Sequence, residues 1–183
     1  MKTQLGTPAS VNLELTEVCN ARCAHCYNPW RAESMGETTL KTDKLDQMID
    51  KIVEAGVFHV ILTGGEPLAA FDSLKHALKR LREHNISTSC NTNLMLATDE
   101  KCKILAELGL DHFLTSLPSR IPEVTDRVMV VPNAFNRIMK GIGAATKNGI
   151  RVSVNMVLTH DTVDQVYATG KLVAEIGAQC LFV

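Results

Sequence analysis

Three cysteines stand close together near the N-terminus, in the spacing C-x-x-x-C-x-x-C. They are Cys19, Cys23 and Cys26 of the stretch CNARCAHC. A disulfide needs two thiols and a structural zinc site four ligands, whereas an iron–sulfur cluster held by only three thiolates keeps one iron open to an outside ligand. A zinc ion held by these cysteines and His25 is the alternative. Because His25 and Cys26 are adjacent, their side chains rarely converge on one tetrahedral ion, so the spacing favours a cluster.

A second motif, Gly64-Gly65-Glu66-Pro67, directly follows the apolar stretch VFHVILT at residues 57–63. Glycine adopts positive φ without steric cost, so this backbone can bend close to a ligand. Taken alone, the glycine pair is equally compatible with a plain turn. Polar residues also follow the next apolar segment, as Asn91-Thr92-Asn93.

The elements that must position these motifs alternate along the chain. Periodicity and turn residues predict strands at 11–15, 57–63, 86–91, 112–117, 151–158 and 180–183, and helices at about 40–55, 72–84, 98–108, 135–148 and 162–176. A loop of about fifteen residues is expected after the fourth strand. Strict alternation implies parallel strands joined by right-handed crossovers, and therefore an α/β fold. An open doubly wound sheet and an open or closed β/α barrel both fit this order.

Polar residues at alternate positions of several strands favour a barrel with a polar lumen. The pattern comprises Asn12 and Glu14, then His59, Ile61 and Thr63, then Ser87, Ser89 and Asn91, then Ser153 and Asn155. Alternate residues of a strand share a face, and central parallel strands are normally apolar on both faces. Positions at strand ends or facing solvent are the alternative explanation. In either architecture the ligand site lies at the carboxyl ends of the strands, where all the unusual motifs fall.

Composition excludes several classes of function. The chain has 183 residues, enough for one domain, with a formal net charge of −1 and 4% aromatic residues, which predicts no nucleic-acid role. It contains no apolar run near the roughly 20 residues that span a bilayer, and its N-terminus lacks the apolar core of a secretory signal. Six cysteines without an export signal indicate a reducing compartment, and we expect a cytoplasmic protein without membrane partners.

The two motifs together resemble those of the radical S-adenosylmethionine (radical SAM) enzymes. Members of this family carry C-x-x-x-C-x-x-C after the first strand and a G-G-E-P loop after the second, as this chain does at Cys19–Cys26 and Gly64–Pro67. The resemblance implies a partial (β/α)6 TIM-like barrel with parallel strands and the sixth strand at the chain end. The local style L-x-x-T-x-x-C-N-x-x-C-x-H-C-Y is similar to the branch of peptide-modifying and cofactor-building enzymes with SPASM-type C-terminal extensions.

The resemblance also implies cofactors and an activity. Cys19, Cys23 and Cys26 would hold a [4Fe–4S] cluster, whose fourth iron is chelated by SAM. One electron from the reduced cluster cleaves SAM to methionine and a 5′-deoxyadenosyl radical, which takes a hydrogen atom from a peptide or small-molecule substrate. A one-electron donor such as flavodoxin or ferredoxin is implied as a partner.

The family's SAM contacts carry over to named positions of this chain. They are His25, Gly64, Gly65, Glu66, Thr92, Ser116, Arg127, Asn155 and Val157. Glu66 and the glycines would meet the SAM amino group, Arg127 the carboxylate, Asn155 the ribose, and Val157 and His25 the adenine. The chain departs from the family pattern at Leu94, where a glycine is common, and at Pro118-Ser119, where an acid and a glycine are common.

Residues 1–183 are expected to be a radical SAM core domain that lacks its last helix and a C-terminal extension. Its sixth strand, CLFV, would leave an exposed edge that a missing domain or a partner covers. Cys90, Cys102 and Cys180 are isolated and are expected to be packing residues. The alternative function is a metal-binding or interaction module without radical chemistry, which would have no need of the Gly64–Pro67 bend.

Overall fold

The structure is a computed structural model, and it describes residues 6–28 and 38–183. The strands are β1 (Ser10–Glu14), β2 (His59–Thr63), β3 (Ser87–Thr92), β4 (His112–Ser116), β5 (Arg151–Asn155) and β6 (Leu181–Phe182). The helices are α2 (Thr42–Glu54), α3 (Phe71–Glu83), α4 (Asp99–Glu107), α5 (Pro122–Met129), α6 (Ala134–Lys147) and α7 (Val166–Glu175), with short 3-10 turns at Pro67–Ala70 and Val163–Gln165. No helix among these residues is long and apolar enough to cross a membrane.

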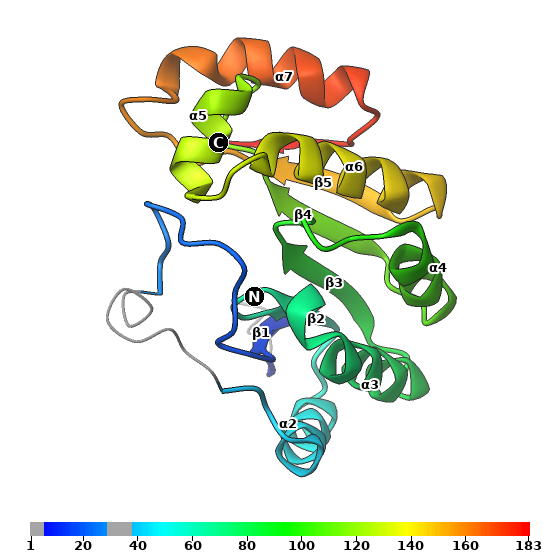
Figure 1. The fold of residues 1–183 in the computed structure, drawn as a ribbon. Helices are drawn as coiled ribbons and strands as arrows, with labels where there is room; N and C mark the ends of the chain where they lie inside the picture. The colour runs from blue at the N-terminus through cyan, green and yellow to red at the C-terminus, as the bar shows by residue number, and fades with distance from the viewer. Residues whose placement is uncertain (1–5, 29–37) are drawn as a thin grey trace, which may run out of the picture.

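The six strands form one sheet in the order β1-β2-β3-β4-β5-β6, and all neighbouring pairs are parallel. A doubly wound sheet reverses its strand order at a switch point, so a strictly sequential order identifies winding of the barrel type. No ladder joins β6 back to β1 in the described chain, so the barrel is partial, as expected. Figure 1 shows the sheet fanning from β1 to β5, with α2, α3, α4 and α6 along one side.

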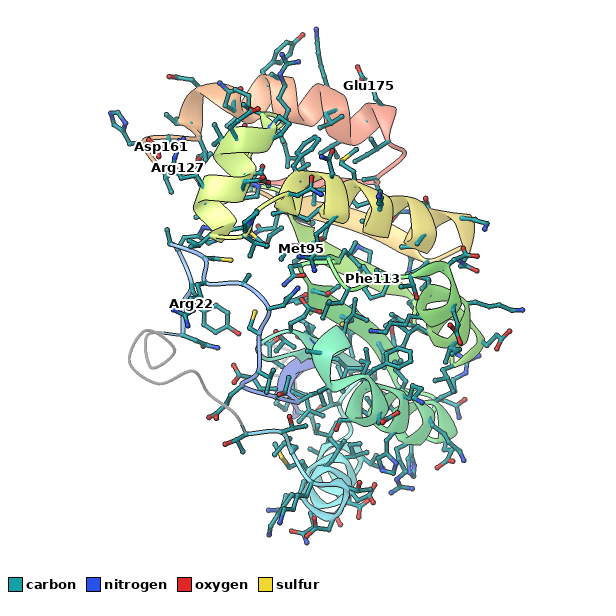
Figure 2. All side chains as sticks on the ribbon, viewed as in Figure 1. Arg22, Met95, Phe113, Arg127, Asp161 and Glu175 are labelled. Carbon is teal, nitrogen blue, oxygen red and sulfur yellow. The ribbon has the colours of Figure 1, made fainter. Side chains whose placement is uncertain are left out.

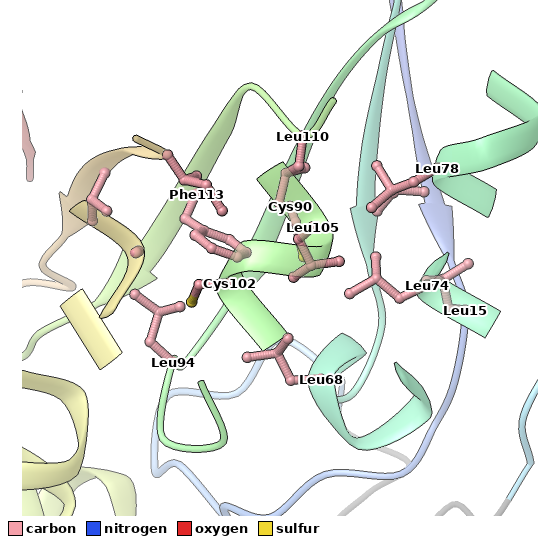
Figure 3. Close-up of a cluster of buried hydrophobic side chains, with 14 of the residues drawn as sticks. Leu15, Leu68, Leu74, Leu78, Cys90, Leu94, Cys102, Leu105, Leu110 and Phe113 are labelled. Carbon is pink, nitrogen blue, oxygen red and sulfur yellow. The ribbon is translucent and has the colours of Figure 1, made fainter. Parts of the chain in front are cut away.

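The outward face of the sheet packs against the helices and forms the core. Its strand residues are apolar and buried, and they include Leu13, Val60, Leu62, Cys90, Phe113, Val152 and Val154. Figure 3 shows Phe113 and Cys90 among leucines from α3 and α4. Burial raises the pKa of Cys90 and raises that of Cys102 to about 11, so both thiols stay protonated and pack as apolar groups. Cys180, expected to pack like them, is instead exposed because it lies just before the short strand at the sheet edge.

The opposite face of the sheet carries the predicted polar pattern, and its members hydrogen-bond to one another. His59 lies 3.0 Å from Ser87 Oγ through Nδ1 and 2.9 Å from Ser89 Oγ through Nε2. His112 Nε2 lies 2.9 Å from Ser153 Oγ. The inner surface of the partial barrel is therefore polar, which ordinary small barrels are not.

One predicted loop is wrong, because the segment after β4 contains α5. Pro122 is the first residue of this helix, where its missing N–H costs nothing. Ser119 fixes the backbone that leads into this helix. Its hydroxyl oxygen accepts from Ile121 N at 3.0 Å, and its carbonyl oxygen accepts from the Thr125 hydroxyl at 2.7 Å. With eight residues, α5 is too short for its apolar period to stand out in the sequence.

Candidate functional site

A cavity of about 330 Å³ lies at the carboxyl ends of the strands. Its lining includes Cys19, Cys23, His25, Cys26, Gly64, Gly65, Glu66, Thr92, Ser116, Asn155 and Val157. The structure thus brings together every predicted site residue except Arg127. These residues come from the ends of β1 to β5, which places the cavity where parallel β/α folds bind ligands.

The glycine motif is held against the start of the cysteine loop. Gly64 has φ +136°, and a Cβ there would collide with the Thr16 carbonyl oxygen. Gly65 N donates to Thr16 O, and Glu66 N donates to Val18 O at 2.8 Å. Gly64 is therefore required for the close approach of two chain segments, and this contact fixes the backbone that leads to Cys19.

Glu66 is the centre of a buried hydrogen-bond network. Its side chain is 1% exposed, and Oε1 accepts from Leu68 N at 3.0 Å and from the Thr92 hydroxyl at 2.5 Å. Oε2 accepts from Asn93 N at 2.8 Å. Burial is the largest influence and raises the pKa of Glu66, while these donors oppose the rise. The carboxylate thus joins the loops after β2 and β3.

Asn93 extends this network to the cysteine loop. Its Oδ1 accepts from Met95 N at 3.0 Å, and its Nδ2 donates to Asn20 Oδ1 at 2.8 Å. Asn20 directly follows Cys19, so loops from three consecutive strands share one chain of hydrogen bonds. The sequence places Asn93 in a polar loop but contains no signal of this bridging role.

Leu94, at the position where the family commonly has glycine, adopts the left-handed backbone conformation. Its φ is +55° and its side chain is completely buried. Helix α6 approaches here so closely that a Cβ on Gly141 would collide with Leu94 O. The backbone thus keeps the conformation that suits glycine, and burial of the leucine side chain offsets the strain.

The cysteine loop contacts the end of α5 on its other side. Arg22 N donates to Met129 O at 3.3 Å, and Ala24 N donates to Val128 O at 3.0 Å. Between them, Cys23 Sγ lies 3.5 Å from Met129 Sδ. Met129 also lines the cavity, although the sequence predicts a loop without regular structure at this position. Figure 1 shows the blue loop after β1 reaching α5.

The donor set fits a cluster better than a single zinc ion. In the described residues, no three Cys, His, Asp or Glu side chains form a group that could hold one metal ion, so the set of Cys19, Cys23, His25 and Cys26 is not assembled. A cluster is larger than one ion and its thiolates stand farther apart, around a cavity such as the one that all three cysteines line. Their role as cluster ligands stays a prediction.

The remaining predicted contacts differ in position. His25 lies on the cavity wall, where burial lowers its pKa and favours the neutral imidazole, and its Nδ1 is a buried atom without a hydrogen-bond partner among the described residues. Arg127 is outside the lining, with its guanidinium 3.2 Å from Asp161 Oδ2, and more than half of its side chain is exposed. Figure 2 shows this pair side by side beyond α5. A contact from Arg127 to SAM stays a prediction.

Comparison with known proteins assigns the family. Residues 13–173 match the family model described as the radical SAM superfamily. The chain belongs to the radical SAM superfamily. Radical SAM enzymes use a [4Fe–4S] cluster and SAM, so the cofactors predicted from the motifs are those of the family.

Relatives of this radical SAM chain are enzymes. A PqqA peptide cyclase from Methylocella silvestris is 30% identical over 176 residues, which cover 94% of this chain and 46% of the relative. A probable GTP 3′,8-cyclase from Methanocella arvoryzae is 32% identical over 172 residues, covering 89% of this chain and 54% of the relative. The chain therefore spans about half the length of the curated relatives it matches.

Solved structures share the fold of this radical SAM chain. SuiB from Streptococcus suis, bound to its precursor peptide SuiA, superposes with a TM-score of 0.82 at 21% identity, over 97% of this chain and 39% of that one. The partial barrel that the family resemblance implied is thereby confirmed.

Proposed function

We propose that this chain is the catalytic core of a radical SAM enzyme. The observation that supports the proposal is that Cys19, Cys23, Cys26 and the Gly64–Glu66 motif line the same cavity. When bound, the cluster supplies one electron that cleaves SAM into methionine and a 5′-deoxyadenosyl radical, which abstracts hydrogen from the substrate. In this proposal residues 1–183 form the core domain of a longer enzyme.

In this proposal the residues of the chain bind the cluster and SAM and hold them in position. The three thiolates would hold the cluster, and Glu66 keeps the loops after β2 and β3 in register at the SAM site. We place His25 and Val157 beside the adenine, Asn155 beside the ribose, and Thr92 and Ser116 among the other SAM contacts. Because Thr92 already donates to Glu66, its contribution to SAM would come through the backbone it fixes.

We propose a peptide as the substrate. Two comparisons support this choice, the PqqA peptide cyclase and the SuiB complex with a precursor peptide. A flavodoxin or ferredoxin would supply electrons, and a cytoplasmic location would keep the thiols reduced.

A metal-binding module without radical chemistry is the competing function. It would need the cysteine loop alone, whereas this chain also positions the Gly64–Glu66 loop through two backbone hydrogen bonds and the buried Glu66 network. Those features have no use in a purely structural site.

One experiment tests the proposal. The protein is reconstituted with iron and sulfide without oxygen, then treated with dithionite and SAM, and 5′-deoxyadenosine is measured. We expect a brown protein that forms this product, and we expect Cys23→Ala to lose both colour and product. Cys180→Ala, which changes an exposed cysteine outside the cavity, is the matched control and should retain both. An iron-loaded wild type that forms no 5′-deoxyadenosine, even within a longer natural chain, would favour the metal-binding module.

A further inference from the structure

The last turn of α5 is built to hold the cysteine loop. A helix leaves its final four carbonyl groups without helical partners. In α5 those of Asp126 and Arg127 accept from Val131 N and Val130 N, and those of Val128 and Met129 accept from the cysteine loop. All four carbonyls are therefore satisfied, and half of them by the segment that carries Cys23.

Helix α5 is itself fixed at both ends, so it can serve as a rigid support. At its start, the Thr125 hydroxyl bonds to the backbone of Ser119. Near its end, the Asp126 carboxylate accepts from Asn133 N at 2.7 Å and from Phe135 N at 2.9 Å, which fixes the first turn of α6. The cysteine loop thus rests on a braced element.

The Met129 side chain closes the space beside Cys23. It is 1% exposed, it lines the cavity, and its sulfur accepts a hydrogen bond at 3.5 Å from the Cys23 thiol, whose proton is lost when the cysteine binds iron as a thiolate. A thioether is polarizable and apolar and has no proton to donate, so it excludes water from a thiolate without offering it a hydrogen bond.

We propose that Met129 is a positioning residue that keeps Cys23 in place and gives one side of its sulfur an apolar cover, and so keeps the reduction potential of the cluster low. This inference rests on the proposed function, since it requires that Cys23 bind the cluster. Reduction adds negative charge, which nearby donors and water stabilise and an apolar cover does not. A low potential is what one-electron cleavage of a sulfonium requires of the donor.

Substitutions at Met129 distinguish the effect of an apolar cover from the effect of an added hydrogen-bond donor. Met129→Leu keeps a similar apolar volume, whereas Met129→Gln keeps the length and adds an amide donor, and Met129→Ser opens space for water. Met139→Gln is the control, because Met139 is half-buried on α6 and outside the cavity lining. Each full chain is reconstituted, its iron and sulfide are counted, and its midpoint potential is measured by an EPR-monitored redox titration without SAM.

We expect wild type, Met129→Leu and Met139→Gln to share one midpoint potential. Met129→Gln and Met129→Ser should titrate at a higher potential and lose iron faster to a chelator. A cluster-bearing Met129→Gln or Met129→Ser protein with the wild-type potential would overturn the inference. A wild type that assembles no [4Fe–4S] cluster would instead overturn the proposed function, and the two failures are therefore distinguishable.

Discussion

Glu66 shows how one buried side chain can order a whole site. Three donors from Leu68, Thr92 and Asn93 converge on a carboxylate that is almost completely buried. Burial disfavours the charged form, and hydrogen bonds favour it. Lys101, whose Nζ donates to Leu68 O at 3.2 Å, adds a cation that also favours the charged form. Burial is the larger influence, so the folded protein holds the Glu66 proton more tightly than the unfolded chain does.

This balance predicts a pH dependence of stability. An unfolded glutamate titrates near pH 4.3, and Glu66 in the folded state titrates higher. Between those two pKa values the folded state binds more protons, so the free energy of unfolding falls as pH rises. Relative to Glu66→Gln, which cannot titrate, wild type should therefore lose stability from about pH 4 upward. Urea unfolding of both proteins across this range measures the difference, and a wild type that gains stability over the variant as pH rises would show that the donors outweigh burial.

At position 94 we expect a glycine variant to be more stable than an alanine variant. Truncating a buried leucine to alanine costs about 2–5 kcal/mol. At φ +55° an alanine would also keep the left-handed strain of about 1–2 kcal/mol, which glycine does not have. We therefore expect Leu94→Gly to be more stable than Leu94→Ala by about 1 kcal/mol, the reverse of the order in helices and strands. The denaturant midpoints of the two variants measure this difference. A more stable Leu94→Ala variant would contradict the left-handed backbone conformation of residue 94.

At the scale of elements, helix α6 braces the loop after β3 through Gly141. Gly141 faces the Leu94 carbonyl at a distance that admits no side chain, whereas Gly143, in the same helix, has no described atom within 4 Å of the place where a Cβ would lie. Alanine is the better helix former by about 1 kcal/mol at both positions. The two glycines therefore differ only in what surrounds them.

A pair of substitutions tests this difference. Gly143→Ala should stabilise the protein by up to about 1 kcal/mol. Gly141→Ala should destabilise it by about 1–3 kcal/mol, because the added methyl group must displace the Leu94 backbone. It should also weaken SAM binding by the reconstituted protein, since the loop that carries Thr92 and Asn93 would shift. Thermal melts measure the stability of each variant, and equilibrium dialysis measures its SAM binding. Equal stability and equal SAM binding of the two variants would contradict a supporting role for Gly141.

The sequence was sufficient for those elements whose signal is strong and local. The strands β1 to β5 and the helices α2, α3, α4, α6 and α7 have clear apolar periods, all of these helices except α3 end shortly before a glycine, and the alternation implied the parallel sheet. Helix α5 was missed because eight residues give little more than two turns, and its Pro122 resembles loop punctuation. The supports of the site were missed for another reason. The contacts of Asn93 and Met129 join distant segments, which no local pattern records.

At the scale of the whole molecule, the site connects opposite regions of the sheet. The cysteine loop leaves β1, is held by the Gly64–Glu66 loop from β2 and by Asn93 after β3, and then contacts α5 after β4. A cluster bound by Cys19, Cys23 and Cys26 would cross-link this loop, and the hydrogen bonds of the loop would couple the cluster to the surrounding elements. Its binding energy then adds to the stability of the whole fold.

Removal of the cluster should therefore lower the melting temperature of the entire domain. For a chain of this length each kcal/mol of binding energy corresponds to about 2–4 °C in Tm. We expect the reconstituted wild type to melt several degrees above its chelated form, and Cys23→Ala to melt at the same temperature with and without iron and sulfide. Differential scanning calorimetry under anaerobic conditions measures the shift, and its absence in a loaded wild type would mean that the cysteine loop is uncoupled from the fold.

The hydrogen bonds of Arg22 and Ala24 to the end of α5 have a consequence for biosynthesis. They join positions separated by more than one hundred residues, whereas the strands pair strictly with their successors. A nascent chain would therefore display its thiols on the ribosome long before α5 emerges to support them. Iron delivery would have to wait for that moment, and ribosome-bound chains stalled before and after α5 has left the ribosome are expected to differ in the iron they retain.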